Sequence, residues 1–469
     1  MKISREKMQA LGYALRHPDL RAAGRRAGEM ITGGWYSKGD EQSGDRMRLL
    51  FYHYEANIVA NWIGGTFYTG LLLLLNADDG FIGTLSLISS GANMLQLFAP
   101  LLMERFPKRK KLMIWMRAII LFMNIVVLGI TPLLPVGQQG RLLVFAGTVL
   151  TMNVLNAFLA PGFSVWTMQS LPERVRGSFF TVITMTVGAV VAVFNLIGSN
   201  IVDFFDARGQ EYLGLMILRA FCVIMVVADT ISYARIKEYP YPGSDQKFTV
   251  KDMLLSPFKE KKYLRTVAMT FLWNIAANIP GSYYTVYLLQ EIEVNYSFIM
   301  TVSMLNVPAV LLLTPVWSKM AAKYNMSWFK MLYVAMGFYM IHYVLLGLVT
   351  PGTVWLYPVA CMLAYVMGIG INLSFTCIPY VNIPEKNQTA FIGFYSAVAN
   401  LAVFVGVFIG RQFVTHTESL HFELLGMPFG GKQMLVFLTA AMMAISVACI
   451  AYIDKINTAE DRKAKELSA

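Results

Sequence analysis

The chain has 469 residues, of which 56% are hydrophobic and 14% charged, and its formal net charge is +11. Soluble domains carry about 25% charged residues, so this composition excludes an ordinary soluble protein and indicates a membrane protein. The positive charge alone would suit nucleic acid, but its placement along the chain, given below, argues against that partner.

Twelve apolar runs are long enough to cross a bilayer as helices, which takes about 20 residues each. They lie near residues 50–76, 81–103, 112–135, 142–169, 178–203, 213–234, 264–290, 297–318, 328–350, 353–383, 388–411 and 432–453. The sequence therefore predicts an all-α integral membrane protein with about twelve transmembrane helices.

Basic residues predict how the chain is oriented. The two tails and the connections at 104–112, 172–177, 235–265, 319–330 and 384–388 hold 33 of the 39 Lys and Arg residues. Cytoplasmic loops are enriched in these residues, so we expect both termini in the cytoplasm of a multi-pass protein of the bacterial inner (plasma) membrane. This placement accounts for the net charge without a nucleic-acid partner.

A short motif occurs twice, separated by about half the chain. The first copy is Asn57-Ile58-Val59-Ala60-Asn61-Trp62-Ile63-Gly64, and the second is Asn274-Ile275-Ala276-Ala277-Asn278-Ile279-Pro280-Gly281. An internal repeat at this spacing is typical of transporters built from two related halves.

The repeat and the charged connections give the domain boundaries. We expect a basic cytoplasmic tail at 1–49, a six-helix bundle at 50–234, a linker at 235–263, a second six-helix bundle at 264–453 and a cytoplasmic tail at 454–469.

The repeated asparagines are the first candidates for a solute site. Asn57, Asn61, Asn274 and Asn278 each offer a donor and an acceptor inside an apolar segment, where an unpaired amide is costly. They could line a watery cavity and bind a neutral solute rich in hydroxyls or amides. Alternatively, they hold helices together, as asparagine does in membranes.

Aromatic residues follow both copies of the motif. We expect a helix break at Pro280-Gly281, because proline lacks a backbone donor, and the freed carbonyls could meet a solute beside Tyr283, Tyr284 and Tyr287. The alternative is a kink packed with aromatics. The remaining candidates for solute binding are Trp62, Tyr68, Asn153, Asn156, Tyr365 and Asn372.

Acidic residues within the helices are scarce. Glu55 precedes the first motif, and the second copy has Leu272 there, so Glu55 is our candidate for proton coupling; alternatively its side chain only reaches the membrane surface. We expect Asp229 to pair with Arg235. We expect Arg219 to pair with Asp203 or Asp206.

Between the second and third runs, the chain resembles the major facilitator superfamily (MFS), whose signature there is G-x-L-x-D-R-x-G-R-K-x-x-L. The corresponding stretch is Pro100-Leu101-Leu102-Met103-Glu104-Arg105-Phe106-Pro107-Lys108-Arg109-Lys110-Lys111-Leu112, in which prolines replace both glycines. A second family-like pair is Leu171-Pro172-Glu173-Arg174 and Ile383-Pro384-Glu385-Lys386.

The resemblance covers residues 50 to 453 and implies alternating access about a central site, to which helices 1, 4, 7 and 10 contribute most contacts. It also implies that Glu104, Arg105 and Arg109 form a cytoplasmic latch; the alternative is that these charges only set the topology.

We therefore expect a monomeric secondary transporter of a small organic solute, favouring import of a neutral polar compound such as a sugar. Efflux of lipophilic compounds is the alternative transport function. An alternative from another functional class is a non-transporting sensor or lipid-handling protein on the same scaffold. No catalytic motif, cofactor site or metal-binding spacing is found, and the four cysteines are read as packing residues.

Overall fold

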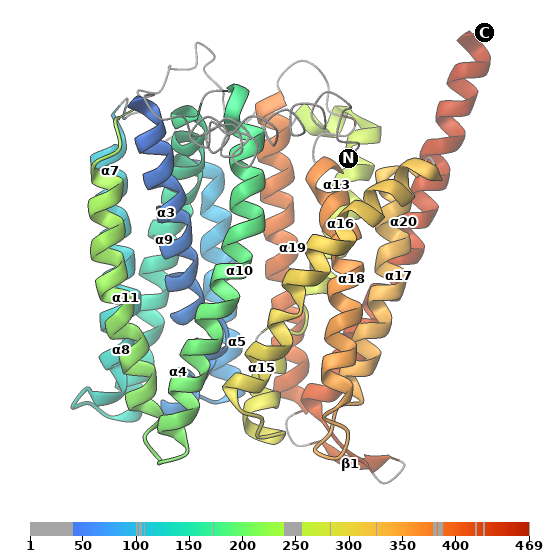
Figure 1. The fold of residues 1–469 in the computed structure, drawn as a ribbon. Helices are drawn as coiled ribbons and strands as arrows, with labels where there is room; N and C mark the ends of the chain where they lie inside the picture. Colours follow the sequence, from blue (N-terminus) through green and yellow to red (C-terminus); the bar gives the residue numbers. More distant parts are fainter. Residues whose placement is uncertain are drawn as a thin grey trace, which may run out of the picture.

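The computed structural model describes residues 41–99, 102, 106, 108–171, 173–238, 256–281, 283–324, 326–378, 382, 388–417, 420–424 and 427–468. Its long helices stand side by side in one bundle, and a small β-hairpin lies at one end (Figure 1). Together these helices form twelve segments of membrane-crossing length, which confirms the predicted all-helical, twelve-span fold.

The first six segments include three that are interrupted along their length. In chain order they are α3 (Glu41–Trp62) with α4 (Gly65–Leu74); α5 (Asp79–Met94) with η1 (Leu95–Phe98); α7 (Lys110–Phe122) with η2 (Met123–Val127), α8 (Leu128–Ile130) and η3 (Thr131–Leu133); α9 (Gln138–Ser170); α10 (Glu173–Asp206); and α11 (Glu211–Ala234).

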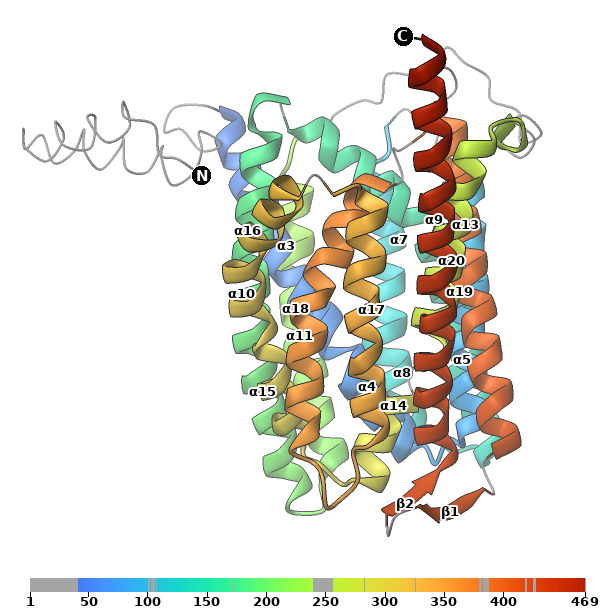
Figure 2. The same ribbon diagram turned by 90° about the vertical axis from the view of Figure 1, so that its right-hand side faces the viewer.

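The second six segments follow a short 3-10 turn, η4 (Ser256–Lys259). They are α13 (Lys261–Asn278) with α14 (Tyr283–Val286) and η5 (Tyr287–Glu291); α15 (Tyr296–Met304) with α16 (Asn306–Lys323); α17 (Trp328–Gly347); α18 (Leu356–Cys377); α19 (Gln388–Thr417); and α20 (Gly431–Ser468). Strands β1 (His421–Leu424) and β2 (Met427–Gly430) form an antiparallel hairpin before α20 (Figure 2).

The start of α3 and the end of α20 lie at the same end of the bundle, which we call the terminal side; the opposite end is the far side (Figures 1 and 2). Both helices reach beyond the predicted spans, because α3 begins at Glu41 rather than 50 and α20 continues to Ser468 rather than 453. Most of the predicted linker, residues 239–255, lies outside the described residues.

Ten helices in the described part of the chain are individually long and apolar enough to cross a membrane. The two segments absent from this set are the first (α3 and α4) and the seventh (α13 and α14), which carry the repeated asparagine motif. The two halves therefore share a structural feature as well as the repeated sequence motif, since the first segment of each is a broken helix.

Both breaks begin at the end of the motif and turn on a glycine. The first lies between Trp62 and Gly65, and Gly65 has a positive φ of 51°. The second lies between Asn278 and Tyr283, and Gly281 has a φ of 48°. Only glycine adopts this left-handed conformation without steric cost. The predicted break at Pro280-Gly281 is confirmed, whereas the break in the first segment was not predicted.

Each break rests on a glycine of the fifth helix in its own half. A Cβ on Gly198 of α10 would lie 2.9 Å from the indole nitrogen of Trp62, and one on Gly410 of α19 would lie 2.0 Å from the carbonyl oxygen of Ile279. Trp62 and Ile279 are equivalent positions of the repeat. Gly198 and Gly410 are equivalent as well, since each lies 26 residues after the proline of its Leu/Ile-Pro-Glu motif. A glycine of the fifth helix thus packs closely against the equivalent residue in each half, against its side chain in the first half and its backbone in the second.

This contact predicts that alanine at either glycine destabilises the protein. Gly198→Ala and Gly410→Ala should each lower the unfolding free energy by about 1–3 kcal/mol, because an added methyl group overpacks a filled contact. We expect Gly410→Ala to cost more, since its neighbour is a backbone carbonyl rather than a side chain. Thermal unfolding of purified protein in detergent measures both effects.

The matched control is Gly188→Ala, in the same helix as Gly198, where a Cβ would meet nothing within 4 Å. Equal unfolding temperatures for the Gly188, Gly198 and Gly410 variants would contradict the proposed packing role.

Candidate functional site

The repeated asparagines make the same hydrogen bonds in both halves. The side-chain nitrogens of Asn57 and Asn61 donate to the backbone carbonyls of His53 and Asn57, at 2.7 and 2.8 Å. Those of Asn274 and Asn278 donate to the carbonyls one turn before them, both at 2.8 Å. Each of these bonds uses one of the two N–H donors, so the side chain keeps one N–H and its oxygen for other partners.

Three of these oxygens are free acceptors. Among the described residues, no hydrogen bond reaches the Oδ1 atoms of Asn57, Asn274 and Asn278. Asn61 differs, because its Oδ1 accepts from Asn195 of α10 at 3.3 Å. The side chains of Asn57, Asn274 and Asn278 are half-buried, and that of Asn61 is exposed. The two halves thus present similar acceptor groups beside their helix breaks.

The polar candidates on other helices are less uniform. Asn153 of α9 donates to Ser89 of α5 at 3.3 Å and to its own helix at 2.8 Å, so it links two helices of the first half. Asn156 and Asn372 are exposed. Asn195 was not among the predicted site residues, although its buried Oδ1 has no partner within the described residues. Its contact with Asn61 could not be found from sequence, since 134 residues separate them.

The aromatic candidates mostly bond within their own half. Trp62 is buried and donates from its indole nitrogen to the Phe194 carbonyl at 3.3 Å. The hydroxyls of Tyr284 and Tyr287 donate to carbonyls at the end of α17, at 3.3 and 2.7 Å. Tyr68 and Tyr365 are half-buried. The polar groups of Trp62, Tyr284 and Tyr287 are therefore occupied, and their rings remain for contact with a solute.

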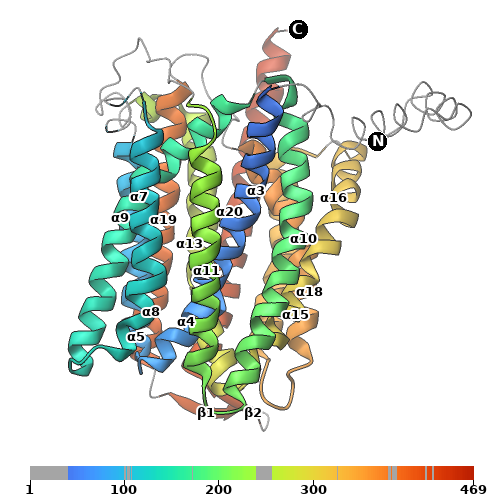
Figure 3. The ribbon, with the colours of Figure 1, turned by 60° about the vertical axis from the view of Figure 1, so that its left-hand side comes forward.

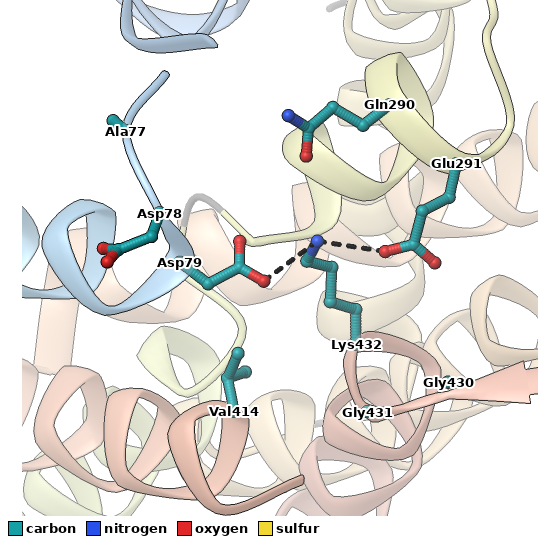
Figure 4. A pocket seen from close by; sticks show the side chains of 9 residues that line it. All are labelled: Ala77, Asp78, Asp79, Gln290, Glu291, Val414, Gly430, Gly431 and Lys432. Atoms are coloured by element: carbon teal, nitrogen blue, oxygen red, sulfur yellow. Dashed lines mark hydrogen bonds and ion pairs between the residues drawn. The ribbon is translucent and has the colours of Figure 1, made fainter. Parts of the chain in front are cut away.

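Tyr283 belongs to a contact between the two halves on the far side. Its hydroxyl donates to the Asp79 carbonyl at 3.3 Å, and Arg411 of α19 donates from Nε to Thr84 of α5 at 3.1 Å. The Lys432 ammonium bridges Asp79 of the first half and Glu291 of the second, at 3.0 Å each (Figure 4). These residues join α5 to the second half.

A polar pocket of about 340 Å³ surrounds the Lys432 bridge. Figure 4 shows Asp79 and Glu291 reaching the ammonium from opposite walls, while Asp78 points away. Asp78 instead caps α5 by accepting from the Phe81 amide at 2.6 Å. The pocket therefore lies at the junction of the two halves, and its central cation is paired from both sides.

A second contact between the halves joins α10 to α15, which lie side by side (Figures 1 and 3). The carboxylate of Asp203 accepts from the backbone amides of Tyr296 and Ser297, at 3.0 and 2.8 Å. A helix of the first half thereby satisfies the free amides at the N-terminus of a helix of the second, where anions are favoured. Tyr296 also donates to Glu211 at 2.6 Å and stacks on Phe67.

All hydrogen bonds and ion pairs between described residues of different halves lie on the far side. The apolar cores follow the same division. One core joins first-half residues with Val286, Tyr296 and Met300 of the second half, whereas the core near the terminal side of the first half contains first-half residues alone. Within the described residues, the polar contacts between the halves are therefore confined to the far side, while α5 and η1 also pack against α19 of the second half.

Two predicted ion pairs are wrong. Asp229 pairs with Arg117 of α7 and not with Arg235, because Asp229 is fully buried while Arg235 is exposed at the helix end. Arg219 bonds neither Asp203 nor Asp206.

Arg219 donates instead to the Asn124 carbonyl, and to the Ile125 carbonyl at 3.2 Å. Both carbonyls belong to the π-helical η2, whose widened turn departs from the regular helical ladder and needs such a donor.

The residues that the family resemblance assigned to a cytoplasmic latch are only partly described. Glu104 and Arg105 lie outside the described residues. Arg109 is buried and donates from Nε to the Phe106 carbonyl at 3.0 Å. Glu55, the candidate for proton coupling, is half-buried in α3.

Comparison with known proteins agrees with this architecture. The sequence profile of the Major Facilitator Superfamily matches residues 56–410. No curated protein sequence matches the chain.

Among solved structures, the nucleoside transporter NupG (a mutant form) has a TM-score of 0.66 at 12% identity, covering 87% of this chain and 99% of that one. A POT family transporter in complex with a thioalcohol-conjugated peptide has a TM-score of 0.63 at 13% identity, covering 88% and 96%. A bacterial homologue of the human lysosomal transporter Spinster has a TM-score of 0.59 at 12% identity, covering 89% and 98%.

The α10–α15 contact predicts how the far side responds to mutation. Asp203→Ala removes the acceptor of two backbone amides, so we expect a larger population with the far ends of the halves separated. Spin labels on cysteines introduced at the exposed positions Ala207 and Gly352 would report that separation as a longer distance, in a background without the four native cysteines.

Asp206→Ala is the control, because Asp206 ends the same helix and no hydrogen bond between described residues involves its side chain. If Asp203→Ala and Asp206→Ala give the same distance distribution, the capping contact does not hold the far side closed.

Proposed function

The chain belongs to the Major Facilitator Superfamily, and we propose that it is a secondary active transporter that imports a neutral, hydroxyl-rich organic solute such as a sugar. It works by alternating access, with the solute bound between the two halves and a proton as the coupling ion. It acts as a transporter rather than an enzyme, and as a monomer.

The observation that carries this proposal is the matched set of amide oxygens. Free acceptors at repeat-equivalent positions of α3 and α13 suit a solute that donates from several hydroxyls. Asn61 and Asn278 lie next to the helix breaks, where a backbone departing from the helix is tolerated if it lines a polar cavity.

The charges on the four helices that the family uses for solute binding support a neutral cargo. The predicted spans 50–76, 142–169, 264–290 and 353–383 contain one basic residue, Arg265, and one acidic residue, Glu55. Arg265 lies at the start of its span and is already paired with Glu460, at 2.7 Å. A carboxylate or phosphate would lack a cationic partner there, and a cation would have only Glu55. Of the fold neighbours, one is named as a nucleoside transporter and another was solved in complex with a thioalcohol-conjugated peptide. At 12–13% identity they show the fold alone, so the choice of solute rests on the side chains of this chain.

The distribution of basic residues supports placing the terminal side in the cytoplasm of a bacterial inner membrane. In that orientation the contacts of Asp203, Arg411 and Lys432 close the extracellular side.

A ligand screen on purified protein tests the proposal. We expect stabilisation by sugars or nucleosides and none by organic carboxylates or lipophilic cations. A ligand at about 100 times its Kd adds roughly 2.7 kcal/mol to the unfolding free energy, which a thermal shift detects. Asn57→Ala and Asn278→Ala should each reduce the shift, because each removes one of the amide oxygens that no described residue occupies.

The control for this screen is Asn200→Ala, an exposed asparagine of α10 that donates only to its own helix, at 2.7 Å. Hits confined to lipophilic cations would overturn the solute class and favour efflux. Asparagine variants that keep the full shift would show that the amides do not bind the solute.

A further inference from the structure

A second buried polar cluster lies between α3, α7 and α11 in the first half, apart from the paired amides. Tyr52, His53 and Glu55 come from α3, Arg117 from α7, and Asp229 and Tyr233 from α11. None of these residues was predicted to bind solute, and Asp229 was expected to be paired at the helix end. Their position raises the question of what a charged cluster does inside an apolar bundle.

Arg117 is the centre of the cluster. Its guanidinium pairs with the fully buried Asp229, donates to the Tyr52 hydroxyl at 2.9 Å and lies 4.7 Å above the Tyr52 ring. Tyr52 in turn packs on Tyr233, with ring centroids 5.6 Å apart. One cation thus ties three helices together, and it already has a carboxylate partner.

Despite this pairing, the cluster holds several unsatisfied polar atoms. Within the described part of the chain, buried atoms without a hydrogen-bond partner include Oε2 of Glu55, Oδ1 of Asp229, Nε2 of His53, Nε of Arg117 and the Tyr233 hydroxyl. Most buried polar groups in proteins are paired, so a group of unpaired atoms in one place calls for an explanation. The two carboxylates accept hydrogen bonds only, and no described donor reaches these two oxygens.

The charges of the cluster also fail to cancel. Arg117 contributes one positive charge, whereas Asp229 and Glu55 contribute two negative ones if both are ionised, and Glu55 interacts electrostatically with Asp229 and Arg117. Two further charges lie at the end of the cluster and offset each other. Glu238 lies near Tyr233 and accepts from the Lys110 amide at 3.2 Å. The Lys110 ammonium donates to the Ala234 and Ile236 carbonyls, at 2.6 and 2.5 Å. His53 lies close enough to Arg117 to be repelled when protonated.

A metal ion is a poor candidate for the missing positive charge. Within the described residues, no group of three or more His, Cys, Asp or Glu side chains has the arrangement of a metal site. Arg117 would also repel a cation at close range. A single proton meets both requirements, since it cancels the excess negative charge and turns one acceptor oxygen into a donor.

We propose that this cluster is a proton-binding site in which Glu55 takes up the proton while Arg117 keeps Asp229 ionised. The proton comes from water and forms an O–H bond on the Glu55 carboxylate, with no electron transfer. Glu55 is half-buried and Asp229 is fully buried, so Glu55 is the more accessible of the two carboxylates. This inference rests on the proposed function, because it assigns the coupling proton of that transporter to particular residues.

The link to solute binding is α3 itself. Glu55 and the amide pair Asn57 and Asn61 lie within two turns of one helix, which packs against α11 and α10. A change of charge at Glu55 alters how α3 is held against α11, and the same helix carries half of the amide oxygens. The proton and the solute therefore bind at separate sites on the same helix, α3.

Infrared spectroscopy of the purified protein in lipid nanodiscs tests the site without any solute. A protonated carboxyl group has a carbonyl stretch distinct from that of a carboxylate. We expect this band at neutral pH in the wild-type protein, its loss when the pH is raised, and its absence at neutral pH in Glu55→Gln. Glu55→Asp, which keeps a carboxyl group, should shift the band rather than remove it.

Glu460→Gln is the control, because Glu460 pairs with Arg265 at 2.7 Å and lies far along the chain from the cluster; it should leave the band unchanged. A band that survives in Glu55→Gln, or no band in the wild type at neutral pH, would overturn the assignment. So would a band that responds to sodium at constant pH, which would indicate a cation site.

The outcome is independent of the ligand screen. A missing band with sugar-induced stabilisation would leave the transporter proposal standing without this proton site. A band that depends on Glu55 with no sugar or nucleoside hit would retain the proton site and overturn the solute class. If Glu55→Gln does not fold, the shifted band of Glu55→Asp decides the assignment.

Discussion

The constraint on which this structure depends is that a backbone inside a membrane must keep its polar groups satisfied. Ten helices are individually long and apolar enough to cross the membrane, whereas the first and seventh segments are broken next to the repeated asparagines. Their breaks are supported from the side instead, by Gly198 under Trp62 and by Gly410 under Ile279. Because glycine has no side chain, the neighbouring helix can approach each break closely, against the indole of Trp62 in the first half and the backbone of Ile279 in the second.

The contact on the far side follows from these breaks. After each break the chain continues as a short helix, α4 or α14, whose direction is no longer fixed by the helix before it. Phe67 of α4 and Tyr283 of α14 then reach partners in the opposite half. The amide oxygens just before the breaks and the cross-half contacts just after them are therefore two parts of one segment, repeated in both halves.

Sequence patterns predicted the parts of this protein that depend on local chemistry. Length and hydropathy predicted twelve spans, and Pro280-Gly281 predicted the break in the seventh segment. The matching break at Gly64-Gly65 was missed because two glycines in an apolar run are common in membrane helices, and proline gives the stronger signal.

Partners distant in the sequence could not be predicted in the same way. Asp229 was assigned to Arg235, six residues away, whereas its partner Arg117 is 112 residues away on another helix. Likewise, nothing in the residues around Asp203 indicates that its carboxylate will cap a helix of the other half. These contacts depend on which helices are neighbours, and the repeat and the loops do not specify that.

The difference between the two copies of the motif is as informative as their likeness. The amide positions are kept in both halves, so a solute held by them is bound from two sides by similar groups. Glu55 has no counterpart, since Leu272 occupies its place in the second half, and Arg117 and Asp229 surround only the first. Two similar halves can rock about a bound solute in either direction. A carboxylate present in one half alone lets protonation change the relative populations of the two arrangements.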